Sequence, residues 1–576
     1  MAKVTGSHLI VKALQAEGVD TVFGIAGDHF LHLLNVMVDY PFRMIDTRHE
    51  SGAVHMADAY SRLLRKAGVA LSTTPGHANA IPGLANAMHS EAPVVNIAGS
   101  AETPNLGRGA MQEFDQVGVA VPVTKGAWQA PSAERIPEYV ALAFRTAMSG
   151  RRGPVHLTIP HDFQSAEVDE SAFERYAPRE YSTPRSVLGD PEQVARAVEL
   201  LYGAQRPVVL AGPSAGSTTE PSELQRLIET TRVPLLTEDS ARALVPDSHS
   251  QSIGFGYLPL NKAARKALAE ADVVLLLGRH IDYMVGFGGA PPFAKGVKQV
   301  LVTPSAAEIG RARTVDVGIL GDVGPVITQL ADAAAKKRWT ERSEWVQSLQ
   351  NARSAFQEEL AEMAVGDDPS TLRPRSGQAS SGRRLMHPMF VSQTLQKFVD
   401  ADTVMAFDGG DYAHFFRASF KAEKPYSWLY VSSFGMIGIG LPYALGAQAA
   451  FPKRRVVLVT GDGSFGFNGM EMDTAVRHNL PVVVVLGNNA IWGIDWQIQK
   501  GLYGRPVWTD LLPTRYDVMA KGLGAHGENV EKASELAPAL KRAFASGKPA
   551  LVNVAIDKVI SPVAEAAISR KLGTHG

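Results

Sequence analysis

Two polar segments that follow apolar runs in the last third of the chain could hold a metal ion against a diphosphate. Gly461-Asp462-Gly463-Ser464 follows apolar residues 456–459, and Asn488-Asn489 follows apolar residues 482–486. We expect each run to be a strand with its polar segment at the tip. Glycine lets the backbone approach phosphate oxygens, while carboxylate and amide oxygens are ligands that Mg²⁺ prefers. The pattern therefore predicts a Mg²⁺ and diphosphate site.

Two other interpretations of the same glycines are weaker. Gly-Asp-Gly alone is an ordinary turn. Gly461, Gly463 and Gly466 also spell G-x-G-x-x-G, which is typical of dinucleotide-binding turns. However, Asp462 would stand where a pyrophosphate passes, and the next strand ends in an Asn pair and not in a ribose-binding acid. A dinucleotide site is therefore disfavoured.

Composition indicates an ordinary globular protein with several domains. The chain has 576 residues, 45% hydrophobic and 20% charged, with a formal net charge of −1. This balance predicts no nucleic-acid partner and no attraction to an anionic membrane surface. A small-molecule substrate is therefore expected.

The chain contains no cysteine, which excludes disulfides, thiolate metal sites and a cysteine nucleophile. No apolar stretch approaches the roughly 18 residues that cross a bilayer. Residues 1–20 read as an amphipathic helix without the apolar centre of a secretory signal. A cytoplasmic location is expected.

Short apolar strands alternate with helical segments along most of the chain, which predicts an α/β fold with parallel sheets. The expected strands include 21–25, 69–72, 94–98, 155–159, 207–212, 273–278, 299–302, 403–407 and 550–555. We expect three doubly wound domains: 1–181, 191–340 and 388–576. Residues 182–190 read as a linker, and 341–387 as a helix followed by an exposed crossover.

With these pieces in order, the whole chain resembles the thiamine-diphosphate enzymes of the acetolactate synthase, pyruvate decarboxylase and benzaldehyde lyase superfamily. The resemblance implies pyrimidine-binding, central and diphosphate-binding domains, with thiamine diphosphate and Mg²⁺ as cofactors. It implies Asp462, Asn489 and the carbonyl of Ile491 as metal ligands. It also implies a homodimer or homotetramer with its active sites between subunits.

Glu50 lies in Arg48-His49-Glu50-Ser51-Gly52, after a predicted strand at 44–46 and at the start of a helix. By resemblance it hydrogen-bonds the cofactor's aminopyrimidine and drives the ring to the imino form that removes the thiazolium proton. Alone it would read as a glutamate favoured by the helix dipole. His49 and His55 do not have the spacing of a zinc motif, so His49 is expected to be structural.

The resemblance assigns further cofactor contacts to four other segments. Pro75 and Asn79 belong to the loop above the pyrimidine, and Asp408-Gly409-Gly410 to a turn that meets the diphosphate. Ile437 matches the bulky residue that bends the cofactor, although it could instead be a core aliphatic. The remaining expected contacts are Gly435, Gly461, Gly463, Ser464, Trp492 and Gly493.

On the substrate side, the resemblance implies catalytic roles for Asp28, His29, Gln112 and Asp495 besides Glu50. Gly27-Asp28-His29 lies where benzaldehyde lyase has a small residue and then His, and where pyruvate decarboxylases have Gly-Asp. The segment around Asp495 resembles bacterial 2-hydroxyacyl-CoA lyase and acetolactate-synthase-like sequences. Pyruvate decarboxylases carry adjacent histidines near the Gln112 position, and this chain does not. Trp492 and Trp496 either line the pocket or pack the following helix.

These features favour a carbon–carbon lyase or carboligase that cleaves a 2-hydroxyacyl-CoA or 2-hydroxy ketone into an aldehyde or ketone and a shorter acyl product. Acetolactate-synthase-like condensation or decarboxylation of 2-oxo acids is the alternative, and a non-catalytic homologue also stays open. In many relatives an acidic residue follows the corresponding strand of the central domain, where the ribose of an adenine nucleotide can bind. Here that strand runs into Thr303-Pro304, so nucleotide binding there is doubtful. Arg383, Arg384, Lys295 and Lys298 could meet a CoA phosphate, but solvated surface charge is the default.

Overall fold

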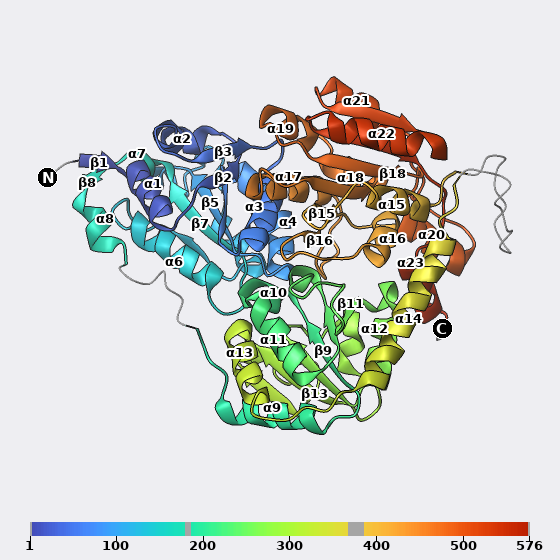
Figure 1. Cartoon of the computed structure of the whole chain (residues 1–576). Coiled ribbons are helices and arrows are strands. Elements are labelled where there is room, and N and C mark those ends of the chain that lie inside the picture. Colours follow the sequence, from blue (N-terminus) through green and yellow to red (C-terminus); the bar gives the residue numbers. More distant parts are fainter. Residues whose placement is uncertain (1–2, 179–185, 367–384, 574–576) are drawn as a thin grey trace.

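The computed structural model describes residues 3–178, 186–366 and 385–573. Three six-stranded parallel sheets, each covered by helices, form three domains (Figure 1). The N-terminal and C-terminal domains lie side by side, and the central domain lies below both of them in this view. Helix α14, Ser343–Glu362, runs along the central domain toward the C-terminal one. The expected three-domain α/β architecture is confirmed.

The N-terminal sheet has the strand order β3-β2-β4-β5-β7-β6. Its strands are β2 Thr21–Gly24, β3 Arg43–Asp46, β4 Gly68–Ser72, β5 Val94–Ser100, β6 Ala127–Gln129 and β7 Val155–Pro160. Its helices are α1 Gly6–Ala16, α2 Leu31–Met37, α3 Glu50–Leu64, α4 Thr74–His89, α5 Gln116–Ala120, α6 Ile136–Met148, α7 His161–Ser165 and α8 Ser171–Tyr176.

The central sheet has the order β11-β10-β9-β12-β13-β14. Its strands are β9 Pro207–Ala211, β10 Leu235–Thr237, β11 Ser252–Phe255, β12 Val273–Leu277, β13 Lys298–Thr303 and β14 Val317–Leu320. Its helices are α9 Pro191–Gly203, α10 Pro213–Thr218, α11 Pro221–Thr231, α12 Lys262–Glu270 and α13 Val323–Ala334.

The C-terminal sheet has the order β16-β15-β17-β18-β20-β19. Its strands are β15 Val404–Phe407, β16 Trp428–Tyr430, β17 Val456–Gly461, β18 Val483–Asn488, β19 His526–Val530 and β20 Ala550–Ala555. Its helices are α15 Pro388–Gln396, α16 Asp411–Ser419, α17 Gly440–Ala450, α18 Asp462–Asn468, α19 Glu471–Arg477, α20 Gly493–Tyr503, α21 Tyr516–Gly522, α22 Ala533–Ala545 and α23 Pro562–Lys571.

The first 20 residues differ from the single expected helix. A short strand, β1 Lys3–Thr5, pairs with β8, Glu167–Asp169, before α1 begins at Gly6. The domain boundaries stay predictions, because residues 179–181 at the expected end of the N-terminal domain, 182–185 of the expected linker and 367–384 of the expected crossover lie outside the described residues. Arg383 and Arg384 belong to the last of these segments.

Helices α3 and α17 join the N-terminal and C-terminal domains through one shared core. Asp58 and Arg62 of α3 form a buried ion pair with 2.7 Å between Oδ1 and Nε. The Tyr443 hydroxyl of α17 donates to the other oxygen of Asp58 at 2.8 Å, and the Asn86 amide donates to the same oxygen. The ion pair is buried and the second carboxylate oxygen of Asp58 is also hydrogen-bonded, so all these contacts form in only one arrangement of the two helices. This network therefore fixes how the two domains sit together.

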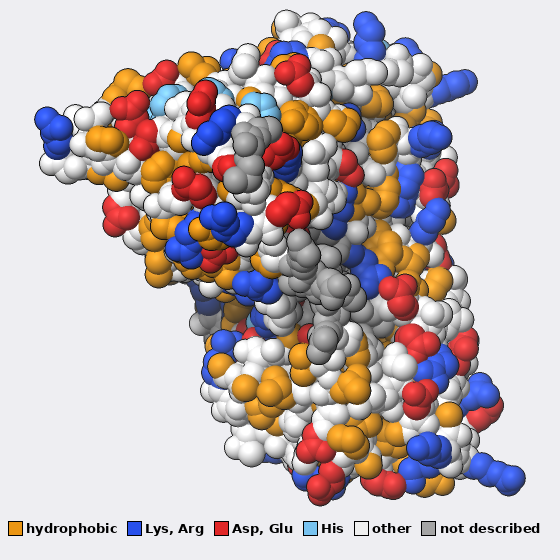
Figure 2. Space-filling view, turned by 90° about the vertical axis from the view of Figure 1, so that its left-hand side faces the viewer, with side chains coloured by type: hydrophobic (Ala, Val, Ile, Leu, Met, Phe, Trp, Pro, Cys, Tyr) orange, Lys and Arg blue, Asp and Glu red, His pale blue; other side chains and the backbone are white. Residues whose placement is uncertain are grey.

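The surface shows no dominant sign of charge on the face drawn in Figure 2, where Lys and Arg side chains alternate with Asp and Glu. This agrees with the net charge of −1. Among the described helices, none is long and apolar enough to cross a membrane.

Candidate functional site

The ends of β17 and β18 bring together the residues that the sequence predicts to hold a metal. Asp462 begins α18 directly after β17 and is only 2% exposed. Its Oδ2 atom is buried and has no hydrogen-bond partner in the described part of the chain. Burial raises the pKa of Asp462 to about 6, although neighbouring backbone N–H groups oppose the rise. A buried carboxylate oxygen without a partner is costly unless a cation or proton meets it.

The Asn pair divides into one structural residue and one candidate ligand. Asn488 donates to the Thr514 carbonyl at 2.9 Å and to Asn553 Oδ1 at 3.1 Å, so its amide is used inside the fold. Asn489 is half-buried, and among the described residues its Oδ1 accepts from the backbone N–H of Ile491 alone, at 3.3 Å. Asp462, Asn489 and the Ile491 carbonyl thus offer three oxygen donors near one sheet edge. These donor types fit Mg²⁺.

No cluster of three or more His, Cys, Asp or Glu side chains suited to a metal occurs among the described residues. That finding agrees with a site of this kind, because two of its three expected protein donors are an amide and a main-chain carbonyl.

The turn after β15 forms the other side of the same crevice. Asp408 is buried, and its carboxylate accepts from the backbone N–H groups of Gly409, Gly438 and Gly440 at 2.8–3.0 Å. The side chain therefore joins its own turn to the segment 438–440 from inside, and a diphosphate would meet the backbone of Gly409 and Gly410 instead. Gly410 has a φ of 108°, which favours glycine at this position.

Small residues and one aliphatic residue shape the crevice. A Cβ at Gly409 would lie 2.5 Å from Cγ2 of Ile437, so this side chain rests on the turn, half-buried. Ser464 donates to the Gly409 carbonyl at 2.8 Å. Trp492 covers Gly463, where a Cβ would come within 2.8 Å of its ring. A Cβ at Gly435 would meet nothing within 4 Å. The crevice is thus open on the Gly435 side.

The second half of the candidate site is Glu50, the first residue of α3. Asn79 donates to Glu50 Oε2 at 3.1 Å, and a Cβ at Gly76 would lie 2.6 Å from Oε1. Only glycine therefore lets the start of α4 approach this carboxylate. Pro75 and Asn79 are exposed beside it. His49 has a structural role, because its ring caps α3 by accepting from the Ser51 N–H.

The two groups of candidate residues have different partners. In the described ranges, no hydrogen bond or ion pair joins Glu50 or Asn79 to Asp462 or Asn489. The partners of Glu50 come from α4, whereas those of Asp462 come from residues after β17 and β18. We call these two groups of residues the N-terminal and C-terminal half-sites.

Asp28 and His29 line a cavity of about 380 Å³ at the carboxyl end of β2. The rest of its lining is Ala101, Glu102, Asn105, Arg108, Gly109, Ala110, Met111 and His161. Gln112 follows this lining on the exposed loop, with a positive φ of 56°. The structure thus brings Asp28 and His29 together in one cavity, and Gln112 is the next residue after the lining residue Met111.

A buried hydrogen-bonded network supports His29 from below. Its Nδ1 lies 3.4 Å from the Thr74 hydroxyl, which in turn accepts from the Gln116 amide at 3.1 Å. Gln116 also accepts from Thr158 at 2.8 Å and donates to the Gly99 carbonyl. Burial lowers the pKa of His29, so the ring is neutral near pH 7.

Sequence reasoning missed Gln116, Arg108 and His161. No spacing rule marks them, because their relation to His29 exists only in the folded sheet.

Asp495 lies exposed on α20, in the C-terminal half-site, and not beside Asp28 and His29. Its charge faces the buried Asp411, whose pKa is raised to about 7, chiefly by burial. The two tryptophans differ. Trp492 lies edge-to-face with Phe467 over the crevice, with 6.0 Å between ring centroids, whereas Trp496 packs against the ammonium groups of Lys500 and Lys558.

Profiles of known families match all three domains. Residues 4–119 match the thiamine pyrophosphate enzyme N-terminal TPP binding domain, 194–330 the central domain, and 408–554 the C-terminal TPP binding domain. The chain belongs to the thiamine pyrophosphate enzymes. Thiamine pyrophosphate is the cofactor called thiamine diphosphate above, so the family expected from the sequence is confirmed.

Curated relatives of this thiamine pyrophosphate enzyme include two kinds of protein. A probable acetolactate synthase of Mycobacterium bovis and the acetolactate synthase large subunit IlvG of Mycobacterium tuberculosis are each 36% identical over 96% of both chains. A 2-hydroxyacyl-CoA lyase of Arabidopsis thaliana is 30% identical over 96% of both chains. The relatives confirm the superfamily, while the lyase branch favoured by the sequence stays a prediction.

Proposed function

We propose that the protein uses thiamine diphosphate and Mg²⁺ to break or form a carbon–carbon bond beside a carbonyl group. In the preferred direction it cleaves a 2-hydroxyacyl-CoA or 2-hydroxy ketone into an aldehyde or ketone and a shorter acyl product. The observation that carries this proposal is the buried Asp462 Oδ2, which has no hydrogen-bond partner in the described part of the chain and lies at a glycine-rich turn. When bound, the cofactor supplies a nucleophilic carbon and accepts the electron pair of the broken bond.

The protein's own groups would have two roles, which are to hold the metal ion and diphosphate and to transfer a proton. Asp462, Asn489 and the Ile491 carbonyl would hold Mg²⁺, and the backbone of Gly409 and Gly410 would meet the diphosphate. Glu50 would hold a proton at the carboxylate oxygen that now accepts from Asn79.

On the substrate side, the neutral His29 ring would hydrogen-bond the reacting carbonyl or hydroxyl. Thr74 fixes that ring from behind. Asp28 shares the cavity with His29, and Gln112 at its rim would complete the polar lining. Since these groups are placed for hydrogen bonding to one small polar centre, they suit a 2-hydroxy carbonyl compound.

A complete site requires a second copy of the chain under this proposal. Apolar side chains are exposed near both half-sites, including Met111 and Phe114 on the N-terminal loop and Phe467 and Met470 after the metal motif. Exposed apolar surface of this kind is typical of interaction faces. We therefore infer a cytoplasmic homodimer or homotetramer in which Glu50 of one copy meets Asp462 of another.

Condensation of 2-oxo acids is the second candidate, because the two relatives at 36% identity carry acetolactate synthase names. Mass spectrometry of products from 2-hydroxyacyl-CoAs, 2-oxo acids and acyloins separates the two. The proposal expects aldehyde or ketone release from a 2-hydroxyacyl compound, lost in Glu50→Gln. Efficient conversion of pyruvate to acetolactate without any such cleavage would favour the second candidate. No turnover of any substrate would contradict both.

A further inference from the structure

The central sheet differs in strand order from the other two sheets, but each of the three has a point at which the order of its strands reverses. In open parallel sheets, ligands bind outside the carboxyl ends of the strands at this switch point. In the C-terminal sheet it lies between β15 and β17, where Gly409 and Asp462 meet. In the N-terminal sheet it lies between β2 and β4, beside Asp28. The equivalent point of the central sheet lies between β9 and β12.

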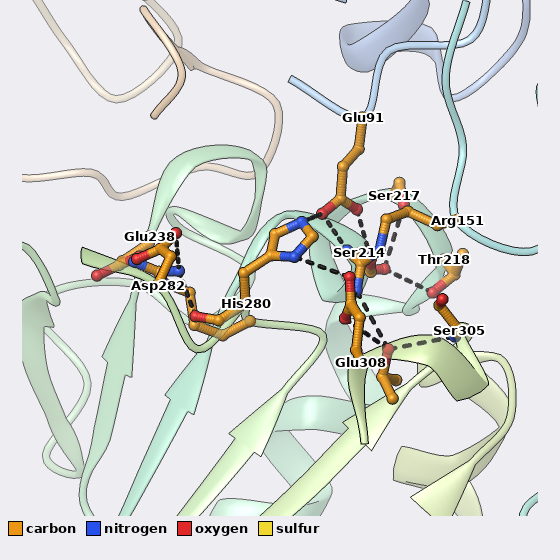
Figure 3. A network of polar contacts seen from close by, with 12 residues as sticks. Glu91, Arg151, Ser214, Ser217, Thr218, Glu238, His280, Asp282, Ser305 and Glu308 are labelled. Atoms are coloured by element: carbon orange, nitrogen blue, oxygen red, sulfur yellow. Dashed lines mark hydrogen bonds and ion pairs between the residues drawn. The ribbon is translucent and has the colours of Figure 1, made fainter. Parts of the chain in front are cut away.

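The central switch point has the donors that an anionic ligand would need. The loops after β9 and β12 touch, since the Gly212 N–H donates to the Leu277 carbonyl at 2.9 Å. Ser214 follows β9, His280 follows β12 and Thr303 ends β13. The Ser214 hydroxyl and the His280 ring converge on the same crevice (Figure 3), and the Thr303 hydroxyl joins them through Arg151 and Glu308. Hydroxyl and imidazole N–H groups at a sheet edge are suited to phosphate or carboxylate oxygens.

Glu91 of the N-terminal domain enters this crevice and binds Ser214 and His280, while the Thr303 hydroxyl donates to Glu308 (Figure 3). The residue follows α4, and its side chain is 2% exposed. One carboxylate oxygen accepts from Arg151 and lies 3.0 Å from Nε2 of His280, while the other accepts from the Ser214 hydroxyl. Both oxygens are therefore satisfied by groups from two domains.

Glu308 balances the charge on the opposite side of the His280 ring. His280 Nδ1 lies 2.9 Å from Glu308 Oε1, and Arg151 also binds Glu308. The cluster contains two cations and two carboxylates, so it is neutral when His280 is protonated. Burial opposes protonation, but the two carboxylates outweigh it and raise the pKa of His280 to about 9. Removing the Glu91 carboxylate would leave one excess positive charge and would take away the acceptor that Arg151, His280 and Ser214 share.

A neighbouring charge cluster is closed. Arg279 is buried and forms ion pairs with Glu238 and Asp282, which lie at the left of Figure 3, so its guanidinium is already paired. The donors released by loss of Glu91 would therefore be those of Arg151, His280 and Ser214.

We propose that Glu91 acts as an internal anionic ligand, because its carboxylate fills the central switch-point crevice and prevents a nucleoside diphosphate from binding there. The same contacts join the N-terminal and central domains. This inference goes beyond the proposed reaction and does not depend on it. Thr303-Pro304 gave a sequence-based reason to doubt a nucleotide at this place, and Glu91 supplies an independent physical one.

The test is calorimetric titration of ADP, and separately of inorganic pyrophosphate, into the full chain presaturated with thiamine diphosphate and Mg²⁺. Presaturation keeps both probes away from the C-terminal crevice. Wild type is expected to bind neither probe measurably at millimolar concentration. Glu91→Ala is expected to bind at least tenfold more tightly than wild type, and the double variant Glu91→Ala, Arg151→Met is expected to lose that gain.

Glu220→Ala is the matched control, because this acid also faces the N-terminal domain but pairs with Arg65 at the surface. It is expected to behave as wild type. ADP binding by the wild type that is as tight as binding by Glu91→Ala would overturn the inference. A folded Glu91→Ala protein that binds neither probe would also overturn it. If Glu91→Ala does not fold, the isosteric Glu91→Gln variant takes its place in the titrations. The wild-type titration also decides by itself, because ADP binding by the wild type that Arg151→Met abolishes would show that the nucleotide site is open.

Discussion

Replacement of His280 by Gln tests the charge cluster between the N-terminal and central domains quantitatively. The ring faces Glu91 and Glu308, with Arg151 as the neighbouring cation, and its side chain is 24% exposed. Its pKa rises from 6.5 to about 9. Because the folded-state pKa is the higher one, the stabilisation is fully present below pH 6.5 and is lost as the pH rises through 9. At 1.36 kcal/mol per pH unit, the full effect is about 3 kcal/mol, of which about 2.5 remains at pH 7.

We expect the melting temperature of His280→Gln to lie below that of wild type by about 5 °C at pH 7, and the gap to close almost completely at pH 9.5. Histidine-selective NMR, with the His280 signal assigned by its loss in the variant, should show a titration midpoint near 9. His526→Gln is the control, because this ring on edge strand β19 has one carboxylate partner, Glu528. A midpoint at or below 6.5, or an equal gap at both pH values, would refute the reasoning.

Three further predictions concern the two half-sites. Glu50→Gln should keep cofactor affinity while slowing exchange of the thiazolium C2 proton severely, as NMR would show; a wild-type exchange rate would exclude the proposed role. Asp408→Ala leaves three buried N–H groups without an acceptor, so the free energy of unfolding should fall by about 3 kcal/mol or more. The melting temperature should then fall by several degrees, and an unchanged melting temperature would contradict this prediction. Mixing Glu50→Ala and Asp462→Ala chains should restore about a quarter of the sites if dimers form at random; no rescue, once native mass spectrometry shows mixed dimers, would mean that both residues serve a same-chain site.

The positions of site residues that directly follow strands could be predicted, because the order of the strands decides where these residues lie. Asp462 and Asn489 come directly after two long apolar runs, and parallel neighbours place both at one sheet edge. Glu50 is the first residue of a helix after β3, as expected, but its role was inferred from the family resemblance and stays a prediction. Local signals in the sequence therefore reach these residues.

Residues whose partners lie far along the chain could not be predicted. Glu91 and His280 meet only because the N-terminal and central domains pack together, and neither residue carries a local pattern. Asp408 was expected to meet the diphosphate, but its carboxylate turns inward because three backbone N–H groups of neighbouring loops need an acceptor there. Such orientation depends on tertiary hydrogen bonds.

The most direct test of the whole account is calorimetric binding of thiamine diphosphate in the presence of Mg²⁺. Asp462→Ala should weaken binding at least a hundredfold, because the ion that joins protein and diphosphate loses its carboxylate. Wild type treated with EDTA should show a similar loss, whereas Glu565→Ala, which removes an exposed acid of α23, should not. Undiminished affinity of a folded Asp462→Ala protein would contradict the central claim.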